Sequence, residues 1–396
     1  MNAVFFHDVR IFYQENEAFS VNFGYEVWLR YLKVFEQLVV VTRAKDASSL
    51  DVTRLKRSSG DNVSFVKVPD FKSIKSFYRY FQAKKIIEEE VKKADAIIAR
   101  NSTIANIAAN YAIKYNKPFA YEVVGCPWGS LWNYGNIQGK IMAPFAYFRT
   151  KKIAKKSPFT LYVTNEFLQK RYPSRGYSIS CSDVDLPKLE DKILEKRIEK
   201  IKRFDPNETI KIGMIGALTS EYKGFDLAIK ASKDLNNKYK NVELHLLGSG
   251  DKSKWKNFSK KMKVQDKVIF EGTLPSGKPV FKWLDNMDIY IQPSKTEGLP
   301  RALIEAMSRG CPAVGSKTGG IPELLDERFI HKKGNYKDLT KKIIFLISNK
   351  EIMIEQAKKN FETSKNYSKD VLDEKRTGFW KEFRKYVESE KSKKTL

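Results

Sequence analysis

The chain has 396 residues, of which 42% are hydrophobic, and its 73 basic residues outnumber its 47 acidic residues to give a formal net charge of +26. This length allows two domains with sizeable cores, and this composition excludes a disordered chain. Charged residues interrupt the apolar runs well before the roughly 18 apolar residues that a membrane-spanning helix needs, so a membrane-embedded protein is excluded as well.

The excess of positive charge attracts phosphate groups in any form, whether they belong to nucleic acid, sugar nucleotides or anionic lipids. The first ten residues have too short an apolar core for a signal peptide and already contain Asp8. Three widely spaced cysteines, Cys126, Cys181 and Cys311, show neither metal nor redox spacing. We therefore expect a cytoplasmic protein with buried thiols.

Short apolar runs alternate with helical stretches along the first half of the chain, which is typical of a parallel sheet with crossover helices. Strands are expected at residues 4–6, 38–42, 63–68, 96–99, 119–124 and 160–164, and helices at 22–35, 73–93, 102–115 and 140–156. A polar break at residues 204–209 precedes a new strand, which predicts a domain boundary between residues 205 and 206. The second half repeats the alternation.

From residue 366 onward, apolar residues recur at helical spacing, and this spacing predicts a last helix with one buried face. They are Tyr367, Val371, Phe379, Trp380, Phe383 and Val387.

A strand, a turn and a short helix are predicted between Ile289 and Gly310. The free N–H groups of Gly298 and Leu299, with the helix dipole, favour an anion at the start of this helix. Two acids beside it, Glu297 and Glu305, would repel an anion and therefore suit hydroxyl groups. Phosphates and hydroxyls together describe a sugar nucleotide. The alternative is an ordinary surface helix with an ion pair between Arg301 and Glu305, worth only about 0.3–0.5 kcal/mol.

The two glutamates stand in a wider pattern. Strand-end segments come in a fixed order at residues 212–218, followed by Lys223 and Gly224, then at 244–250, 268–274 and 293–323. This order resembles the family 4 retaining glycosyltransferases. The resemblance implies the GT-B fold, in which two Rossmann-like parallel-sheet domains face each other across a cleft. Residues 1–205 would bind the acceptor, residues 206–365 would bind the nucleotide sugar, and a helix at 366–396 would cross back to the first domain.

The resemblance also implies an activity, namely transfer of a sugar from a nucleotide diphosphate sugar to a glycan or lipid-linked saccharide in bacterial cell-surface polysaccharide synthesis. Glu297 would hold the donor sugar, Lys223 the diphosphate and Glu305 the ribose, without a cofactor or metal. The other donor-binding residues would be Gly216, Ala217, Gly248, Gly250, Leu274, Ser294, Gly298, Leu299 and Pro300.

Three features depart from the family pattern. Ala217 stands where the family has an arginine, Gly24 is the remainder of a Gly-Gly turn, and the strand end near Cys126 lacks the family's histidine. We expect acceptor contacts in the first domain from Gly24, Glu122, Cys126, Trp128 and Asn133. Asp183 and Asp185 have the spacing of a metal-binding Asp-x-Asp pair, but Asp185 with Pro187 favours a helix start, so no metal is expected.

Two basic, aromatic helices predict contact with an anionic membrane surface, where each Lys or Arg is worth about 1 kcal/mol. One spans residues 140–156 with Phe145, Phe148, Arg149, Lys152 and Lys156, and the other spans residues 72–85. The alternative is that their apolar residues belong to the core. A membrane face would place the protein on the inner side of the cell membrane.

Two other functions remain open from the sequence. A nucleic-acid-binding protein would explain the charge, but it needs a recognisable reading element, so no nucleic-acid partner is expected. A catalytically weak or silent relative that serves a polysaccharide assembly complex would explain the missing arginine and histidine.

Overall fold

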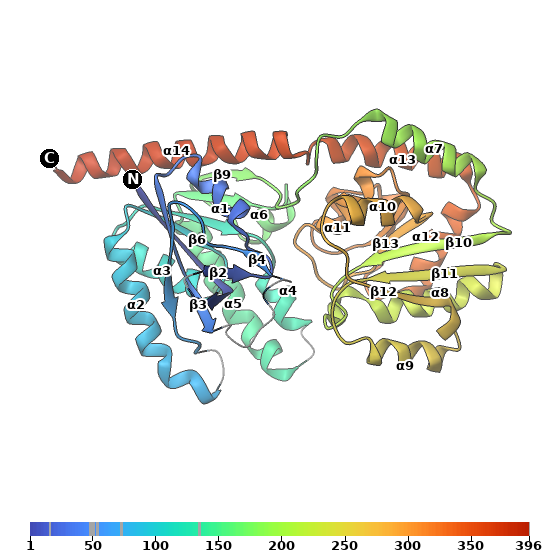
Figure 1. Ribbon diagram of the computed structural model, residues 1–396, viewed down its shortest axis with the longest axis horizontal. Coiled ribbons are helices and arrows are strands. Elements are labelled where there is room, and N and C mark those ends of the chain that lie inside the picture. Colours follow the sequence, from blue (N-terminus) through green and yellow to red (C-terminus); the bar gives the residue numbers. More distant parts are fainter. Residues whose placement is uncertain (16, 47–51, 53–54, 72–73, 134–135, 396) are drawn as a thin grey trace.

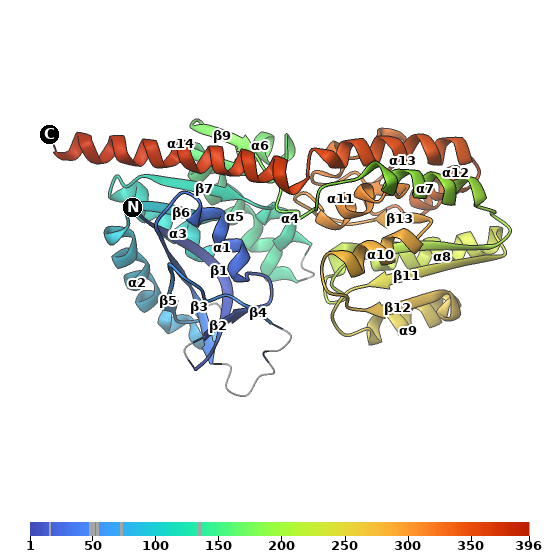
Figure 2. The same ribbon diagram turned by 45° about the horizontal axis from the view of Figure 1, so that its top comes forward.

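The computed structural model describes the chain except residues 16, 47–51, 53–54, 72–73, 134–135 and 396. Two α/β lobes lie side by side, and the last helix runs along the first lobe (Figures 1 and 2). The predicted helix at 73–93 begins on Ser73, which lies outside the described residues. The two-domain fold of Rossmann-like parallel sheets that the sequence predicts is confirmed.

The first lobe is built on parallel strands in the order β5-β3-β1-β6-β7-β8-β9, with β1 between β3 and β6. Its elements are β1 (Asn2–Gln14), β2 (Glu17–Ser20), α1 (Tyr25–Leu32), β3 (Gln37–Asp46), β4 (Lys56–Arg57), β5 (Val63–Val68), η2 (Ile74–Arg79), α2 (Tyr80–Lys93), β6 (Ala96–Arg100), α3 (Thr103–Lys114), β7 (Phe119–Val123), α4 (Pro127–Trp132), α5 (Ile137–Lys156), β8 (Phe159–Tyr162), α6 (Phe167–Arg171) and β9 (Tyr177–Ser180).

An antiparallel extension departs from the prediction of a purely parallel first sheet. Strand β1 continues past its expected end and forms a hairpin with β2, which in turn pairs with β4. The register of β1 against β3 shifts between Phe6 and Arg10. Such an irregularity re-aims side chains near the strand end. The short elements β2, β4, β9, α4 and α6 were not predicted, because runs of two to six residues carry little periodicity.

The second lobe has one parallel sheet in the order β12-β11-β10-β13-β14-β15. Its elements are α7 (Asp191–Arg203), β10 (Thr209–Ile215), η3 (Glu221–Lys223), α8 (Phe225–Lys238), β11 (Asn241–Leu247), α9 (Ser253–Met262), η4 (Gln265–Lys267), β12 (Val268–Gly272), α10 (Lys278–Asn286), β13 (Ile289–Gln292), α11 (Arg301–Ser308), β14 (Ala313–Ser316), η5 (Ile321–Glu323), η6 (Glu327–Phe329), β15 (Ile330–His331), α12 (Tyr336–Ile347) and α13 (Lys350–Lys365).

Helix α7 packs on the second lobe, although it precedes the predicted boundary at residues 205 and 206. The buried guanidinium of Arg197 donates to the carbonyls of Leu284 (2.8 Å), Met287 (2.6 Å) and Arg309 (3.0 Å). In Figure 2, α7 lies beside α13 over the second sheet. We therefore propose that the second structural unit begins with α7.

The chain crosses between the lobes twice, and the two crossings lie side by side through a bridge between Leu186 and Ser368. The second crossing leads into α14 (Lys369–Thr395), which returns to the first lobe. Trp380 is fully buried there, with its ring 5.3 Å from that of Tyr31. Of the predicted apolar stripe, Val371 is half-buried and its neighbour Leu372 is buried instead. The return of the last helix is therefore confirmed.

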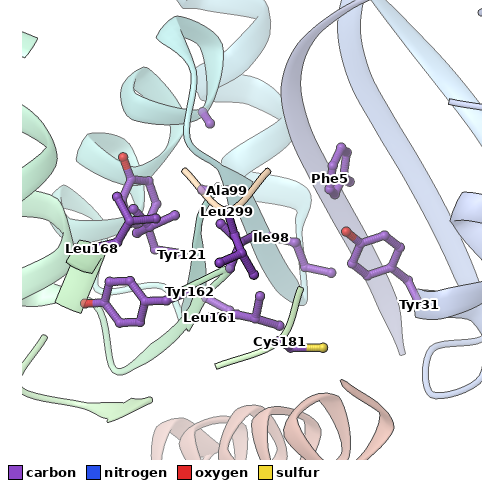
Figure 3. Close-up of a cluster of buried hydrophobic side chains, with 14 of the residues drawn as sticks. Phe5, Tyr31, Ile98, Ala99, Tyr121, Leu161, Tyr162, Leu168, Cys181 and Leu299 are labelled. Carbon is purple, nitrogen blue, oxygen red and sulfur yellow. The ribbon is translucent and has the colours of Figure 1, made fainter. Parts of the chain in front are cut away.

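The buried core of the first lobe extends into the junction between the lobes. Leu299, at the start of α11, is 8% exposed and belongs to the same cluster as Ile98 and Ala99 of β6 (Figure 3). An apolar contact of this kind holds the two lobes together at the place where the predicted donor motif begins.

Candidate active site

The predicted donor motif follows β13, and its first acid is held by three donors. The Oε1 atom of Glu297 accepts hydrogen bonds from Ser294 Oγ (2.7 Å), Lys223 Nζ (2.8 Å) and Gln292 Nε2 (3.1 Å). Tyr290, which is buried, fixes Gln292 from behind with a 2.7 Å bond from its hydroxyl. The Oε2 atom accepts no hydrogen bond from the described residues. Glu297 is thus oriented in advance and keeps one oxygen for a ligand.

The loop after Glu297 leads into α11 with Pro300 as its N-cap residue. The amides of Gly298 and Leu299 donate to no group within the described part of the chain. Gly319 packs closely against this loop and has a positive φ of +57°. A Cβ at this position would lie only 2.4 Å from the carbonyl oxygen of Glu297. Unpaired amides at a helix start attract anions. The structure therefore keeps the predicted arrangement of an acid beside a positive helix end.

Lys223 reaches Glu297 because the chain turns sharply behind it. Gly224 has a φ of +86°, and a Cβ on it would lie 2.2 Å from the carbonyl oxygen of Pro293. Gly216 and Gly248 allow a second close approach, since a Cβ on Gly248 would lie 1.9 Å from the carbonyl oxygen of Gly216. These glycines bring strand ends together. Two other predicted donor-binding residues also lie at or after strand ends. Gly250 has a φ of +117°, and Leu274 follows β12 and is 39% exposed.

The family has an arginine at the position of Ala217, and either Lys295 or Arg301 could provide its positive charge instead. Lys295 is already committed, because its Nζ lies 3.1 Å from a carboxylate oxygen of Asp226. Arg301 is exposed in the first turn of α11 and forms no ion pair with the described residues. Arg301 is therefore the better placed cation.

Glu305 lies one helix turn further, half-buried on α11. Burial raises the pKa of Glu305 to about 7, while nearby Arg301 lowers it and Asp185 adds to the rise. Burial also raises the pKa of Tyr290, and the carboxylates of Glu305 and Glu297 both add to that rise. The carboxylates of both acids of the motif therefore act on the same buried hydroxyl.

The predicted acceptor residues of the first lobe fall into two groups. Glu122 is 2% exposed and accepts from Tyr31 Oη (2.9 Å) and Arg100 Nη1 (2.8 Å), so it is an internal group. Cys126 is buried, caps α4 by accepting from the Gly129 amide, and lies 3.3 Å from Tyr172 Oη. Both therefore support the fold rather than face a ligand.

The other predicted acceptor residues lie nearer the surface. Trp128 stacks on Trp132 with ring centroids 5.3 Å apart, and Trp132 is 44% exposed. Asn133 closes α4 by donating to the carbonyl of Gly129 (2.8 Å). Gly24 precedes α1 with an ordinary φ of −76°. Tyr134 and Gly135, which follow Asn133, lie outside the described residues. Of the predicted acceptor region, the stacked rings of Trp128 and Trp132 are therefore the part that still offers an exposed surface for an acceptor.

A cavity of about 320 Å³ between the lobes contains residues that sequence reasoning did not select. The first lobe lines it with His7, Asn22, Phe23, Arg30, Arg100 and Asp183, among others. The second lobe adds Leu299 and Arg301. The sequence could have indicated these lining residues through their position at predicted strand ends, because Arg100 ends β6 and Val124 follows β7. A larger hollow of about 670 Å³ lies beside α7 and contains no motif residue, so the interlobe cavity is the relevant one.

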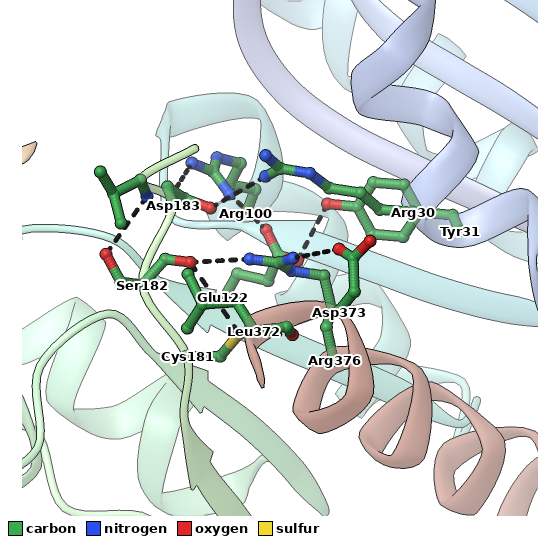
Figure 4. A network of polar contacts seen from close by, with 11 residues as sticks. Arg30, Tyr31, Arg100, Glu122, Cys181, Ser182, Asp183, Leu372, Asp373 and Arg376 are labelled. Atoms are coloured by element: carbon green, nitrogen blue, oxygen red, sulfur yellow. Dashed lines mark hydrogen bonds and ion pairs between the residues drawn. The ribbon is translucent and has the colours of Figure 1, made fainter. Parts of the chain in front are cut away.

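Asp183 does not start a helix, contrary to the capping role predicted for its segment, because α7 begins only at Asp191 after Glu190. Its carboxylate binds two arginines instead, Arg30 through Oδ1 (3.3 Å) and Arg100 through Oδ2 (2.5 Å) (Figure 4). These charges hold the pKa of Asp183 well below its ordinary value, against the opposing effect of burial. Across the described residues, no group of His, Cys, Asp or Glu is arranged to hold a metal ion.

The lobes touch around the motif. A Cβ on Gly298 would lie 2.8 Å from the carbonyl oxygen of Val124, and one on Gly129 would lie 2.2 Å from Thr296 Oγ1. Glu323 of the second lobe accepts from the amides of Asn165 (2.6 Å) and Phe167 (2.7 Å) at the start of α6. The Glu297 side chain is consequently 9% exposed. Residues of both lobes therefore limit the access to Glu297.

The architecture and this site together define a glycosyltransferase of the GT-B type. Residues 195–363 match the family described as Glycosyl transferases group 1. Protein CapJ of Staphylococcus aureus is 32% identical over 375 residues, which cover 93% of this chain and 92% of CapJ. The chain belongs to the group 1 glycosyltransferases.

Two further similarities agree with this assignment. The amylovoran biosynthesis glycosyltransferase AmsK of Erwinia amylovora is 34% identical over 127 residues, which cover 30% of this chain and 31% of AmsK. Anabaena Alr3699/HepE in complex with UDP-glucose superposes with a TM-score of 0.65 at 15% identity, covering 96% of this chain and 98% of that one. The resemblance that the two-glutamate motif predicts is thus confirmed at the level of a group 1, GT-B glycosyltransferase.

Proposed function

We propose that this glycosyltransferase is a retaining enzyme of family 4, which moves a sugar from a nucleotide diphosphate sugar to a saccharide hydroxyl. The observation that carries the proposal is the fixed Glu297 carboxylate, held by Lys223 and Ser294 beside the unpaired amides of Gly298 and Leu299. In this proposal Glu297 binds the donor sugar hydroxyls through its open oxygen. The amides and Lys223 bind the diphosphate, and Glu305 binds the ribose.

The proposed reaction takes place on one face of the donor sugar. The bond from the anomeric carbon to the diphosphate oxygen breaks, and the acceptor oxygen forms its bond from the same side. The proton of the acceptor hydroxyl passes to the departing phosphate oxygen, so the linkage keeps its configuration. The protein then mainly stabilises the negative charge that develops on the diphosphate. Lys223, the helix start and Arg301 provide positive charge there without a resident metal.

The setting that we propose is the synthesis of a bacterial cell-surface polysaccharide, on the cytoplasmic side of the membrane. The name of AmsK places that relative in amylovoran biosynthesis, which supports a polysaccharide as the product here. The acceptor would be a glycan or a lipid-linked saccharide.

An exposed apolar stripe on α5 supports contact with an anionic membrane. Phe145 is 61% exposed and Phe148 is 66% exposed, so neither belongs to the core. Arg149, Lys152 and Lys156 follow them as exposed cations on the same helix. On η2 and α2, Phe77, Tyr78 and Phe81 are exposed as well, whereas Lys72 lies outside the described residues. No helix in the described part of the chain is long and apolar enough to cross a bilayer.

The proposed function is tested by a thermal-shift screen over nucleoside diphosphates and their sugars, followed by assays of sugar transfer and donor hydrolysis with and without a chelator. A ligand at one hundred times its dissociation constant raises the free energy of unfolding by about 2.7 kcal/mol. The expected result is activity with one nucleotide sugar that survives the chelator and is lost in Glu297→Gln. Binding without turnover on any acceptor would instead favour a catalytically silent relative.

A further inference from the structure

The interlobe cavity lies where α/β folds bind ligands. Strand β1 lies inside the first sheet, with β3 on one side and β6 on the other, so the strand order reverses between β1 and β6. His7 comes from β1 at its register shift, and Arg100 ends β6. Ligands of such sheets occupy the crevice outside the strand ends at this switch point. The volume of about 320 Å³ is within the range of about 300–1,000 Å³ for small-molecule sites.

The polar groups that line the cavity offer more donors than acceptors. Three guanidinium groups face it, from Arg30, Arg100 and Arg301, against one carboxylate, that of Asp183. Both oxygens of Asp183 are already used by Arg30 and Arg100. The hydrogen-bonding capacity that the charged lining residues keep for a ligand therefore consists of N–H donors.

One of these donors is buried and orphaned. Arg100 binds Glu122 through Nη1 and Asp183 through Nη2, but its buried Nε–H meets no acceptor in the described chain. Arg100 is held rigidly, since Tyr31 fixes Glu122 from the other side (Figure 4). Buried donors without a partner are rare in folded proteins. This unpaired group marks Arg100, a residue of the cavity wall, as a position with unused hydrogen-bonding capacity.

We propose that this cavity binds an acidic group of the acceptor, a carboxylate or a phosphate close to the hydroxyl that receives the sugar. This inference rests on the proposed function and names the chemical class of its acceptor. Planar guanidinium groups match both kinds of anion. Two sources provide this chemistry, namely a uronic acid within the growing glycan and the diphosphate of a lipid-linked sugar.

The position of the cavity relative to the donor motif agrees with an acceptor site. The cavity shares Leu299 and Arg301 with the start of α11, but it is not lined by Lys223, Glu297 or Gly216. An anion there would adjoin the α11 end of the predicted diphosphate site, while Lys223 lies outside the cavity lining. Arg301, which belongs to both, would connect the two ligands.

Binding and transfer are measured on the full chain with the nucleotide found in the screen. The probes are methyl glucuronide, its neutral counterpart methyl glucoside, and a short polyprenyl diphosphate sugar, each titrated by calorimetry with nucleotide present. We expect at least one acidic probe to bind ten times or more tighter than the neutral one, and this preference to weaken with added salt. Preference for the glucuronide identifies a sugar acid, and preference for the diphosphate identifies a lipid carrier. Equal binding of the acidic and neutral probes by the parent protein overturns the proposal.

Variants of α1 provide a second test. Arg30→Gln should raise the acceptor KM for the acidic probe at least tenfold without weakening nucleotide binding measured in the absence of acceptor, while Arg30→Lys should keep part of the preference. Lys33→Gln is the matched control, because it removes one charge from the end of the same helix, where Lys33 pairs with Asp373. If Arg30→Gln weakens nucleotide binding without acceptor, the cavity belongs to the donor and the inference fails. Absence of turnover with every donor and acceptor would instead count against the proposed function.

Discussion

The two lobes place their polar groups in different ways. In the second lobe, Gln292, Ser294 and Glu297 lie within six consecutive residues, and Lys223 joins them from one other loop. In the first lobe, the charged cavity residues come from separate strand ends and helices, as Arg30 and Arg100 do. A local site keeps its chemistry through spacing along the chain. A site assembled from distant segments depends on packing, and the first prediction therefore concerns what packs the first lobe.

The largest expected effect is on the stability of the first lobe. Trp380 of α14 is fully buried, with its ring 4.8 Å from Phe379 and 5.3 Å from Tyr31. Trp380→Ala should lower the free energy of unfolding by about 3–5 kcal/mol, because it removes a buried aromatic side chain and leaves a cavity. Denaturant unfolding measures this, with exposed Lys381→Ala as the control. Nucleotide binding at low denaturant should survive in the second lobe. A loss below 1 kcal/mol would show that α14 is not needed for the first lobe.

The two lobes also differ in how much the sequence predicts. The donor motif was found from residues 293–323, because its spacing is local and its helix has clear start and stop residues. In the first lobe, the helix start was predicted at Asp185 and Pro187, and no role was predicted for Asp183, whose carboxylate binds Arg30 and Arg100. These partners are 153 and 83 positions away along the chain. Periodicity predicts which strands exist and roughly where they end, but it does not predict which strand ends become neighbours.

The second prediction tests the donor site directly. Lys223→Ala should lower the rate of sugar transfer by about 10²–10³-fold, the usual effect of removing one preorganised charge-stabilising group. Glu297 keeps its bonds from Ser294 and Gln292, so the loop should keep its shape. Transfer and donor hydrolysis are measured at saturating nucleotide sugar. Lys254→Ala is the control, because this exposed lysine pairs with Glu221, which lies on the same short helix, η3, as Lys223. Equal activity of the two variants would remove Lys223 from the proposed mechanism.

The third prediction concerns the exposed aromatic rings of α5 in the first lobe. Phe145→Ser combined with Phe148→Ser should weaken binding to anionic vesicles at least tenfold, because burying each phenyl ring contributes about 1.5–3 kcal/mol. Transfer to a soluble acceptor should be unchanged. Cosedimentation with vesicles containing phosphatidylglycerol measures the binding. Phe345→Ser provides the comparison, since Phe345 is 38% exposed on α12 of the second lobe. Vesicle binding that persists in the double variant would assign the exposed rings of α5 another role.

The smallest effect is expected at Glu305, the half-buried acid of α11. Burial raises the pKa of Glu305 from 4.5 to about 7. The folded protein therefore binds more protons than the unfolded chain between these two values. The contribution of Glu305 to the free energy of unfolding is present at low pH and is lost as the pH rises from 4.5 to about 7. Solvent screening keeps this effect small, because the side chain is half-buried.

Glu305→Gln removes this titration. The stability of the variant relative to the parent should increase between pH 5 and pH 8, as measured by urea unfolding at each pH. Nucleotide affinity tests the same group in its proposed role, because an ionised carboxylate accepts ribose hydroxyls more strongly than a neutral acid does. In the parent, affinity for the nucleoside diphosphate should rise as the pH passes about 7, and Glu305→Gln should lose that rise. Glu362→Gln, an exposed acid on α13 that pairs with Lys365, should leave both profiles unchanged. If the parent and Glu305→Gln show the same pH dependence of affinity, the ribose contact must come from another side chain.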